Sequence, residues 1–471
     1  MPMRKDALPY MAGDAGLESA PPIEESYDYV IIATGSRPFV PPMDGFGKAG
    51  TFMFRTIDDC SRIADYAQDC KKAVVIGGGL LGLEAARGLL THGVEVTVLE
   101  AAPQLMIAQL DPESGQILKS TMEGMGVKVF TDKITTHIVD VNGKITHLQC
   151  KDGCTIETDM VVVSAGIRPI TEVASVSGLT VDKAIVCDDQ MRTSDPDIFS
   201  VGECVQHRGR IYGLVDPIWE MANVLADVIT GKNTKAAYLG SKLGTKLKVM
   251  GCELASMGET KPQPTDEVVL YREPSRGIYQ KIIIRENKLA GAILLGDISS
   301  ANALLQMFYA GSRVPDRRSE MLFGSEPGGS MVQAVTMPDS VQICNCNGVS
   351  KKQIVDAIQS GCTSLAKVGG CTRAGSGCGS CKGMITQLIE AYKGAGEADP
   401  SEHFYVPGIA LEKSQLVAEI RSRELKSVSA VFRELAVDGK EDAASKVGLA
   451  SLLEIALAGR VRRRTRRALY Q

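Results

Sequence analysis

Hydrophobic residues in the first half of the chain occur as short uninterrupted runs rather than as long stripes. The run over 73–76 leads into a glycine-rich turn and a helical pattern, and a second run over 94–99 follows. Runs over 29–32 and 160–163 end in similar glycine-containing turns. Short apolar runs that alternate with helices are typical of buried parallel strands. The pattern therefore predicts an α/β fold with two related halves.

Other segments show strict alternation of apolar and polar residues. Asn142-Gly143 and Asp152-Gly153 each separate alternating runs, which is a strong hairpin signal and predicts a three-stranded antiparallel element. Alternation returns over 245–298, and the spacing over 212–230 and 301–310 predicts two helices. These features predict a small α+β domain after the two α/β halves.

The glycine-rich turn has the chemistry of a dinucleotide site. Gly77, Gly79 and Gly82 have the G-x-G-x-x-G spacing between a strand and a helix, and Glu100 ends the next strand. In this context Gly77 permits the tight turn, Gly79 permits close approach of a pyrophosphate, and Gly82 permits close helix packing. Glu100 is placed to bind ribose hydroxyls, and no arginine follows it over 101–103. The sequence thus predicts NADH, with NADPH less favoured.

Four cysteines form two close pairs in the C-terminal third of the chain. Cys344 and Cys346 make a C-x-C motif, and Cys378 and Cys381 make a C-x-x-C motif. Four thiolates are enough for one [2Fe–2S] cluster or one zinc ion, and unligated thiols are a further alternative. We favour a cluster, because a nucleotide site on the same chain supplies a source of electrons.

A helix is expected between the two cysteine pairs. Ser350 and Gln353 have the spacing of a capping box, and Gly361 marks the end of the helix. Two further cysteines, Cys362 and Cys371, fit neither pair in spacing and are left out of the ligand set.

Composition excludes several functional classes. The formal net charge of −4 gives no reason to expect nucleic acid or membrane binding. We find no apolar segment long enough to span a membrane and no signal peptide, so a cytoplasmic location is expected. A reducing compartment argues against a disulfide framework for the 13 cysteines, and the scattered ones are expected to be small buried residues.

The order of motifs resembles the pyridine-nucleotide-dependent flavoprotein reductases. A strand leads into Ala33-Thr34-Gly35, the glycine turn follows, and a later strand ends at Gly202-Glu203. In such reductases the Gly–acid pair lies beside the ribityl chain of the flavin, with its carboxylate accepting a ribityl hydroxyl. The resemblance therefore implies FAD, although the usual acid is Asp and this chain has Glu203.

Residues 27 to about 457 resemble, more narrowly, the large subunit of assimilatory NAD(P)H-dependent nitrite reductase. Matching stretches include those around Arg55, Gly77 to Ala86, Gln109-Leu110-Asp111, Thr193 to Ile198 and Cys344 to Cys381. The cysteine unit resembles the bacterioferritin-associated-ferredoxin-like [2Fe–2S] domain. The resemblance assigns Arg55 to the cofactor site and places Glu84 near the nicotinamide.

The family implies an electron path from NADH through FAD to a [2Fe–2S] cluster. In the complete enzyme a sirohaem–[4Fe–4S] centre then reduces nitrite to ammonium. No G-x-G-x-x-G precedes Tyr27, no sirohaem domain follows 457, and a basic run occupies 458–471. We expect an electron-transfer portion truncated at both ends, with a nicotinamide, an acceptor domain or small redox protein, and a second copy of the chain as its partners.

The resulting fold class is α/β: a two-dinucleotide-binding-domain flavoprotein reductase with an α+β interface domain and a small helical [2Fe–2S] domain. The expected division is 1–69 partial FAD-binding domain, 70–150 NAD-binding domain, 151–230 remainder of the FAD-binding domain, 231–312 interface domain, 313–339 linker, 340–395 [2Fe–2S] domain, 400–457 helical linker domain and 458–471 basic tail. Three alternatives stay open: an NADH:ferredoxin- or rubredoxin-type reductase, the electron-transfer subunit of an assimilatory nitrate reductase, and an inactive fragment or zinc-binding interaction module.

Overall fold

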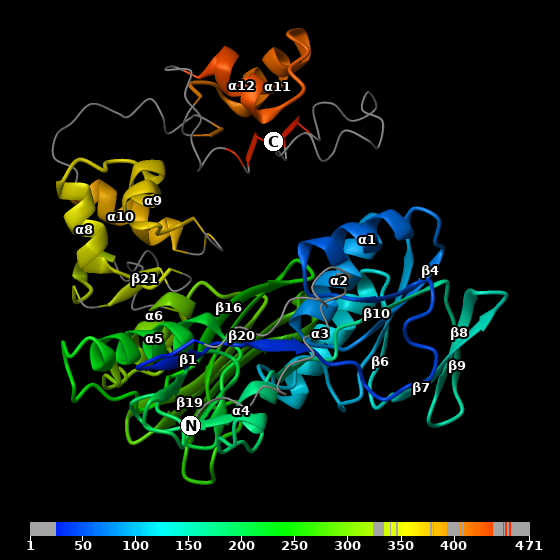
Figure 1. Ribbon diagram of the computed structural model, residues 1–471, viewed down its shortest axis with the longest axis horizontal. Helices are drawn as coiled ribbons and strands as arrows, with labels where there is room; N and C mark the ends of the chain where they lie inside the picture. The colour runs from blue at the N-terminus through cyan, green and yellow to red at the C-terminus, as the bar shows by residue number, and fades with distance from the viewer. Residues whose placement is uncertain are drawn as a thin grey trace. The chain divides into compact units, whose positions relative to one another are not determined.

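The chain forms two compact units, residues 1–331 and 332–471, in a computed structural model (Figure 1). Each unit is described by itself. The structure describes residues 25–323, 334–339, 341–344, 347–376, 379, 381–392, 405–406, 409–436, 446, 448–449 and 452–453. In these residues no helix is both long and apolar enough to cross a bilayer.

A five-stranded parallel sheet forms the centre of the first unit, and we call the region around it the glycine-turn half. Its strands, in spatial order, are β3 (Thr51–Met53), β10 (Met160–Val163), β4 (Lys72–Ile76), β5 (Glu95–Leu99) and β6 (Lys128–Phe130). The three helices of this half are α1 (Ile57–Ala67), α2 (Leu80–Thr91) and α3 (Pro112–Gly124). The sheet crosses both boundaries expected at 69/70 and 150/151, because β10 pairs with β4 on one side and with β3 on the other.

Both faces of this sheet are covered. Val75 points into a core shared with the helices, whereas Val74 points into a second core on the opposite face. The second face is covered by an antiparallel element of β7 (Thr135–Val141), β8 (Lys144–Cys150) and β9 (Thr155–Glu157), seen beside β6 and β10 in Figure 1. This confirms the three-stranded element that the Asn-Gly and Asp-Gly signals predict.

The second α/β region is assembled from two distant stretches, 25–38 and 167–231, and we call it the split half. β1 (Val30–Ile32) pairs in parallel with β13 (Ile198–Ser200), and β2 (Ser36–Pro38) pairs with β11 (Ile167–Pro169). The two similar Arg-Pro strand exits are thus hydrogen-bonded neighbours. The remaining elements are α4 (Glu172–Val176), β12 (Ile185–Cys187), β14 (Val205–His207), β15 (Arg210–Ile211) and α5 (Val215–Ile229).

The alternating segment over 245–298 forms a five-stranded antiparallel sheet, as expected. Its strands are β16 (Gly244–Val249), β17 (Cys252–Gly258), β18 (Glu267–Glu273), β19 (Ile278–Arg285) and β20 (Lys288–Leu295), with the 3-10 helix η1 (Pro274–Arg276) between β18 and β19. Helix α6 covers Ala301–Ala310, which are the predicted bounds. One face of the sheet packs on α6, and Tyr279 and Leu254 on the other face belong to the core of the glycine-turn half.

The segment expected as a linker is partly structured. Val314, Met321 and Leu322 are buried in the core of the antiparallel sheet, and the last two belong to the short helix α7 (Glu320–Phe323). At its other end, Ala334 and Met337 pack into the core of the second unit. The described part at each end of the segment therefore belongs to the core of a neighbouring domain.

The second unit begins with a small helical domain that carries the cysteine motifs. Its elements are η2 (Ala334–Thr336), β21 (Gln342–Cys344), β22 (Val349–Ser350), α8 (Lys351–Gln359), α9 (Leu365–Thr372) and α10 (Lys382–Tyr392). Ser350 and Gln353 form the predicted capping box. Helices α11 (Lys413–Ser422) and α12 (Val428–Leu435) build a separate core. The basic tail over 458–471 lies outside the described residues.

Candidate functional site

The turn between β4 and α2 has a backbone that only glycine accepts at two positions. Gly77 has φ of +122°, and a Cβ there would lie 2.2 Å from the carbonyl oxygen of Ser164. A Cβ on Gly82 would lie 2.0 Å from the carbonyl oxygen of Gly77. These distances are far below van der Waals contact, so α2 packs directly against the turn. The packing role predicted for Gly82 therefore has a geometric basis in the structure.

Gly79 stands apart, because it faces open space. No atom lies within 4 Å of the position that its Cβ would take. Gly79 is also the N-cap of α2, and it makes no side-chain hydrogen bond to the first turn. Unpaired N–H groups at a helix start attract anions, and the helix dipole adds to this attraction. The turn therefore has the space and the donors that a pyrophosphate requires.

Glu100 lies against this turn, at the end of β5. One carboxylate oxygen, Oε2, accepts a hydrogen bond of 2.6 Å from the Gly78 N–H, and Oε1 accepts one of 2.7 Å from the Ala102 N–H. The side chain is thus held beside the open space at Gly79. A carboxylate that is fixed in this way accepts ribose hydroxyls and repels a 2′-phosphate.

Glu84, on the second turn of α2, contacts the antiparallel domain. Its Oε1 accepts a hydrogen bond of 3.3 Å from the N–H of Met250. Met250 has φ of +52° and lies in the turn between β16 and β17. The side chain is only half-buried. Its observed contact is therefore structural, and its role near a nicotinamide stays a prediction.

Three side chains meet at the edge of the split half: Ser36 and Glu203 belong to this half, and Arg55 follows β3 of the glycine-turn half. Arg55 donates to Glu203 Oε2 and to Ser36 Oγ at 3.2 Å each, and Ser36 Oγ donates to the same Glu203 oxygen. We call these three residues the Ser–Arg–Glu cluster. It brings together Arg55 and Glu203, which are 148 residues apart in sequence.

Strand pairing places the two glycine-containing exits beside this cluster. The Val201 N–H donates to the Ile32 carbonyl at 3.1 Å, so Ala33-Thr34-Gly35 and Gly202-Glu203 leave neighbouring strands at the same sheet edge. Gly35 and Gly202 both have positive φ, +66° and +98°. Thr34 Oγ1 donates to the Ile170 carbonyl at 2.6 Å, which fixes the first exit. The carboxyl edge of parallel strands is where α/β folds bind ligands.

This edge fits the ribityl end of a flavin nucleotide. Within the described residues, Glu203 Oε1 has no hydrogen-bond partner, so it is open to a hydroxyl of the ligand. Residues 1–24, which precede β1, lie outside the described residues. The fit therefore concerns the ribityl end alone.

The described parts of the two cysteine motifs are connected by the amide side chain of Asn347, which follows β21. Cys344 and Cys381 are both buried in one core. Asn347 Nδ2 lies 3.7 Å from Cys344 Sγ and also donates to the Arg373 carbonyl at 2.9 Å. Cys346 and Cys378 lie outside the described residues, so the four-ligand set stays a prediction. Two buried thiols in one core, with an amide donor beside one sulfur, fit a thiolate-bound cluster.

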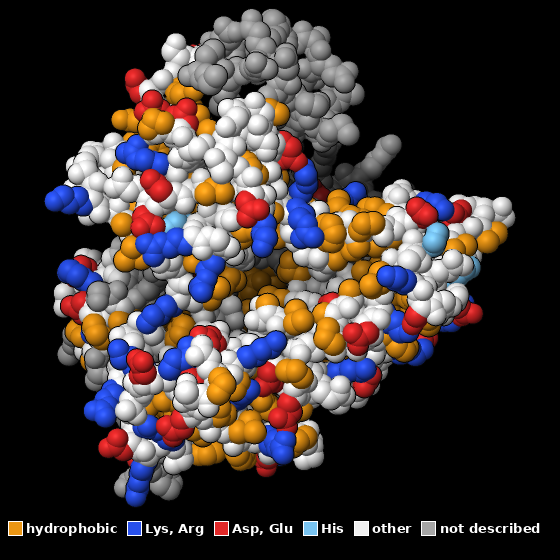
Figure 2. Space-filling view, turned by 90° about the horizontal axis from the view of Figure 1, so that it is seen from below, with side chains coloured by type: hydrophobic (Ala, Val, Ile, Leu, Met, Phe, Trp, Pro, Cys, Tyr) orange, Lys and Arg blue, Asp and Glu red, His pale blue; other side chains and the backbone are white. Residues whose placement is uncertain are grey.

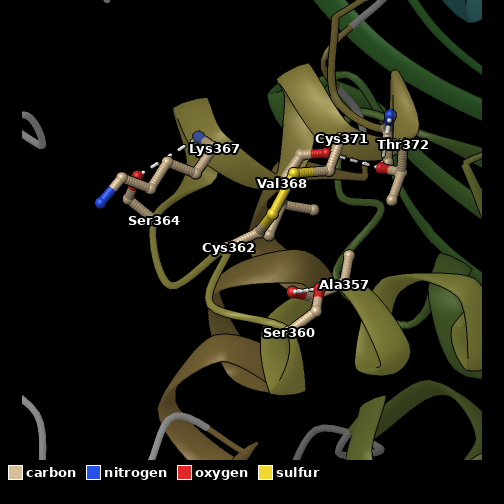
Figure 3. The surroundings of a disulfide bond; sticks show 9 residues. Ala357, Ser360, Cys362, Ser364, Lys367, Val368, Cys371 and Thr372 are labelled. Carbon is tan, nitrogen blue, oxygen red and sulfur yellow. Dashed lines mark hydrogen bonds between the residues drawn. A yellow bond between two sulfur atoms is a disulfide. The ribbon is translucent and has the colours of Figure 1, made fainter.

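The structure also joins the two cysteines that had no assigned role. Cys362 and Cys371 form a disulfide (Figure 3). Among the scattered cysteines, Cys150 and Cys187 are buried as expected, whereas Cys60 is exposed. Cys70, Cys154 and Cys252 are half-buried. Burial raises the pKa of Cys187 to about 12 and that of Cys70 to about 11, so both thiols are protonated at neutral pH.

Sequence reasoning missed three contributors to these sites: Ser36, Asn347 and the disulfide. Ser36 directly follows the predicted Gly35, and Asn347 directly follows Cys346. Adjacency to a motif is therefore the signal that could have found Ser36 and Asn347, whereas the Cys362–Cys371 pair is adjacent to no predicted motif. Among the residues coloured in Figure 2, basic and acidic side chains both occur on the face that is shown.

Three family models match consecutive parts of the chain. Residues 18–222 match pyridine nucleotide-disulphide oxidoreductase, residues 244–309 match the rubredoxin NAD+ reductase C-terminal domain, and residues 342–391 match the BFD-like [2Fe-2S] binding domain. The first model implies FAD and NAD(P)H, and the third implies a [2Fe–2S] cluster. The matches thus agree with the cofactors expected from the motifs.

Curated relatives cover most of this chain. Nitrite reductase [NAD(P)H] of Bacillus subtilis is 39% identical over 87% of the chain and 51% of its own length. The assimilatory nitrate reductase electron transfer subunit of the same organism is 34% identical over 87% of the chain and 53% of its own length. The chain thus spans about half the length of these relatives.

A shorter relative is covered more completely. The nitric oxide reductase FlRd-NAD(+) reductase of Vibrio vulnificus is 30% identical over 59% of the chain and 72% of its own length. Among solved structures, a NAD-dependent persulfide reductase from A. fulgidus is 29% identical, with a TM-score of 0.55 over 62% of this chain and 58% of that one. The chain therefore belongs to the pyridine nucleotide-disulphide oxidoreductases, as an NAD(P)H-dependent oxidoreductase whose reductase part is followed by a BFD-like [2Fe-2S] binding domain.

Proposed function

We propose that this chain is the electron-transfer portion of an assimilatory nitrite reductase, which passes electrons from NADH through FAD to a [2Fe–2S] cluster. The observation that carries the proposal is that one chain holds both a formed glycine turn and two motif cysteines, Cys344 and Cys381, buried in one core. When bound, FAD would supply the change from two-electron hydride chemistry to single-electron transfer, and a [2Fe–2S] cluster would supply a one-electron carrier. Reduction of nitrite to ammonium, with sirohaem and a [4Fe–4S] centre, belongs to the complete enzyme.

The residues of this chain bind and orient the two nucleotides. The N–H groups at the start of α2, beside Gly79, hold the pyrophosphate of NADH, and Glu100 accepts its adenosine ribose hydroxyls. Gly202, Glu203 and the Ala33-Thr34-Gly35 turn hold the ribityl end of FAD. Arg55 fixes the Glu203 carboxylate and offsets its charge.

An absorption spectrum of the anaerobically purified full chain, with added FAD, tests the path. On addition of NADH we expect the flavin band to bleach and the cluster bands to fall. Unchanged spectra with both cofactors bound would contradict the proposal. An iron-free protein that contains zinc would instead support the alternative of a zinc-binding interaction module.

Iron content tests the ligand set Cys344, Cys346, Cys378 and Cys381. We expect Cys378→Ser to lose most of its iron, because serine is a poor ligand for a [2Fe–2S] cluster. Cys60→Ser is the matched control, since Cys60 is exposed and belongs to the first unit. Full iron occupancy in Cys378→Ser would remove Cys378 from the ligand set.

The nucleotide preference is tested by the ratio of kcat/KM for NADH and NADPH. We expect NADH to be favoured in the wild type, because the Glu100 carboxylate repels a 2′-phosphate. Glu100→Gln removes this charge but keeps an acceptor for the Gly78 N–H. The preference should therefore narrow in Glu100→Gln, and an unchanged ratio would contradict the role of Glu100.

The electron acceptor has a second candidate. The similarity to the nitrate reductase electron transfer subunit favours a nitrate reductase as an alternative acceptor. To distinguish the two acceptors, the reduced chain is mixed in turn with a sirohaem nitrite reductase module and with a nitrate reductase. The acceptor is the protein that reoxidises the chain. Two further expectations stay predictions. Light scattering tests whether the chain forms a homodimer, and cell fractionation tests whether it is cytoplasmic.

A further inference from the structure

The Cys362–Cys371 disulfide has one exposed and one buried half. Cys362 follows helix α8 and is only 8% exposed, whereas Cys371 lies in the last turn of α9 and is exposed. Figure 3 shows the bond crossing from the loop after α8 to α9, beside Val368. A nucleophile from solvent therefore reaches the Cys371 sulfur more readily than the Cys362 sulfur.

The last turn of α9 is also bonded to both cysteine loops. Helix α9 ends at Arg373, a left-handed residue with φ of +66°. The Arg373 carbonyl accepts from Asn347 Nδ2 at 2.9 Å and from Ser376 Oγ at 2.7 Å. Asn347 lies on the loop of Cys344, and Ser376 lies on the loop that leads to Cys378. The disulfide thus anchors the helix end to which both loops are bonded.

We propose that the Cys362–Cys371 disulfide is an exchange site for a protein dithiol, and that its opening loosens the loops that hold the cluster. A thiolate of the dithiol attacks Cys371 Sγ, so that an intermolecular S–S bond forms, the Cys362–Cys371 bond breaks, and Cys362 leaves as a thiolate that takes up a proton. The second thiol of the donor then displaces Cys371. The donor is oxidised to its disulfide, and two electrons and two protons move to the two cysteines.

The effect on the loops follows from chain connectivity. In the closed state the disulfide fixes both ends of the segment 362–371 to each other. In the open state, the end of α9 is held by non-covalent contacts alone, such as the burial of Val368. Removing such a cross-link enlarges the set of accessible conformations. The part of the proposal that concerns the cluster rests on the proposed function, whereas the exchange chemistry does not.

Alkylation mapping of the full native chain tests the exchange site. Before treatment we expect Cys362 and Cys371 to be unlabelled, and after dithiothreitol to be labelled together. Cys60, exposed and unpaired, is the internal control and is labelled in both samples. Labelling of Cys362 and Cys371 without reductant would overturn the proposal, as would a bond that dithiothreitol opens only after the protein is unfolded.

Iron release to a chelator tests the effect on the loops. We expect Cys371→Ser to release iron on the order of tenfold faster than the wild type, because the cross-link is lost. The substitution replaces only the exposed cysteine of the disulfide and leaves the buried Cys362 in place. Cys60→Ser is the matched control. Equal release rates would overturn the link to the cluster. A chain purified without iron would contradict the proposed function and leave the alkylation result standing.

Discussion

The glycine-turn half and the split half have related folds but differ in how their strands are buried. Val74 and Val75 on β4 are both fully buried, on opposite faces of a five-stranded sheet. On β1 of the split half Ile32 is buried, whereas Ile31 is 51% exposed. Tyr29, just before β1, is 52% exposed. In the part of the chain that the structure describes, one sheet is enclosed and the other has an open face.

The two candidate sites also differ in whether backbone atoms or side chains shape them. The nucleotide turn is shaped by backbone atoms that exclude any Cβ at Gly77 and Gly82. The edge of the split half depends on the side chains of the Ser–Arg–Glu cluster. Close-packed backbone cannot adjust to an added atom, whereas a half-exposed side-chain cluster exchanges partners with water. Substitutions should therefore cost more in the first half than in the second.

The largest effect is expected at Asp111. Burial raises the pKa of Asp111, but hydrogen bonds from Lys281, Ser114 and Tyr279 outweigh this and hold the pKa below its usual value. Asp111→Asn leaves Lys281, 12% exposed, without its counter-ion. We expect a loss of about 3 kcal/mol in the free energy of unfolding at pH 7, measured by urea denaturation.

Asp189 is the residue of the split half that we compare with Asp111, through the pH dependence of the free energy of unfolding. Hydrogen bonds from Arg208 and His207 lower the pKa of Asp189 to about 2. Because each folded pKa lies below the unfolded value, both carboxylates stabilise the fold above about pH 4 and lose this contribution as the pH falls through the folded pKa. Asp189 is 40% exposed, so Asp189→Asn should cost less than about 1 kcal/mol. Equal losses from the two variants would contradict the difference between the halves.

Gly82→Ala should give the next largest effect. Its Cβ would lie 2.0 Å from the Gly77 carbonyl oxygen, so the turn must shift, and we expect a loss of about 1–3 kcal/mol in thermal or urea unfolding. Gly79→Ala is the control, because its Cβ enters open space. It should keep the stability of the wild type and weaken NADH binding in calorimetry. If Gly79→Ala binds NADH normally, the open space is not the pyrophosphate site.

Arg55→Met should have a moderate effect that is confined to the Ser–Arg–Glu cluster, where Arg55 contacts Ser36 and Glu203 of the split half. The substitution removes both hydrogen bonds from Arg55 to Ser36 and Glu203. We expect the Kd for FAD to rise about fivefold, which corresponds to about 1 kcal/mol, with no change in the Kd for NADH. Glu203→Gln, which keeps the shape of the side chain, distinguishes charge from geometry. A parallel loss of NADH binding in Arg55→Met would show that the two sites are not independent.

Glu84→Gln should have the smallest effect on stability. Glutamine keeps an acceptor for the Met250 N–H, so we expect a change of at most about 0.5 kcal/mol in unfolding. If Glu84 also orients the nicotinamide, the rate of flavin reduction should fall while stability is kept. Glu84→Ala removes the acceptor and serves as the destabilised comparison.

The motifs that depend on local spacing could be predicted from the sequence. The capping box at Ser350, the helix over 301–310 and the glycine turn are set by neighbours a few residues away, and the structure agrees with each. The domain boundaries were harder to predict from the sequence. Strand β3 joins the glycine-turn sheet because it pairs with β10, more than 100 residues later. No local pattern carries that information.

The order of residues alone predicted the chemistry of this chain from a glycine turn, a strand-terminal acid and two cysteine pairs. Folding in three dimensions decided which distant residues meet. It joined Ser36, Arg55 and Glu203 at one sheet edge, linked Cys362 to Cys371, and tied Glu84 to Met250. The reason is physical: turns and helix caps are determined by bonds within a few residues, whereas these contacts depend on how whole strands and helices pack.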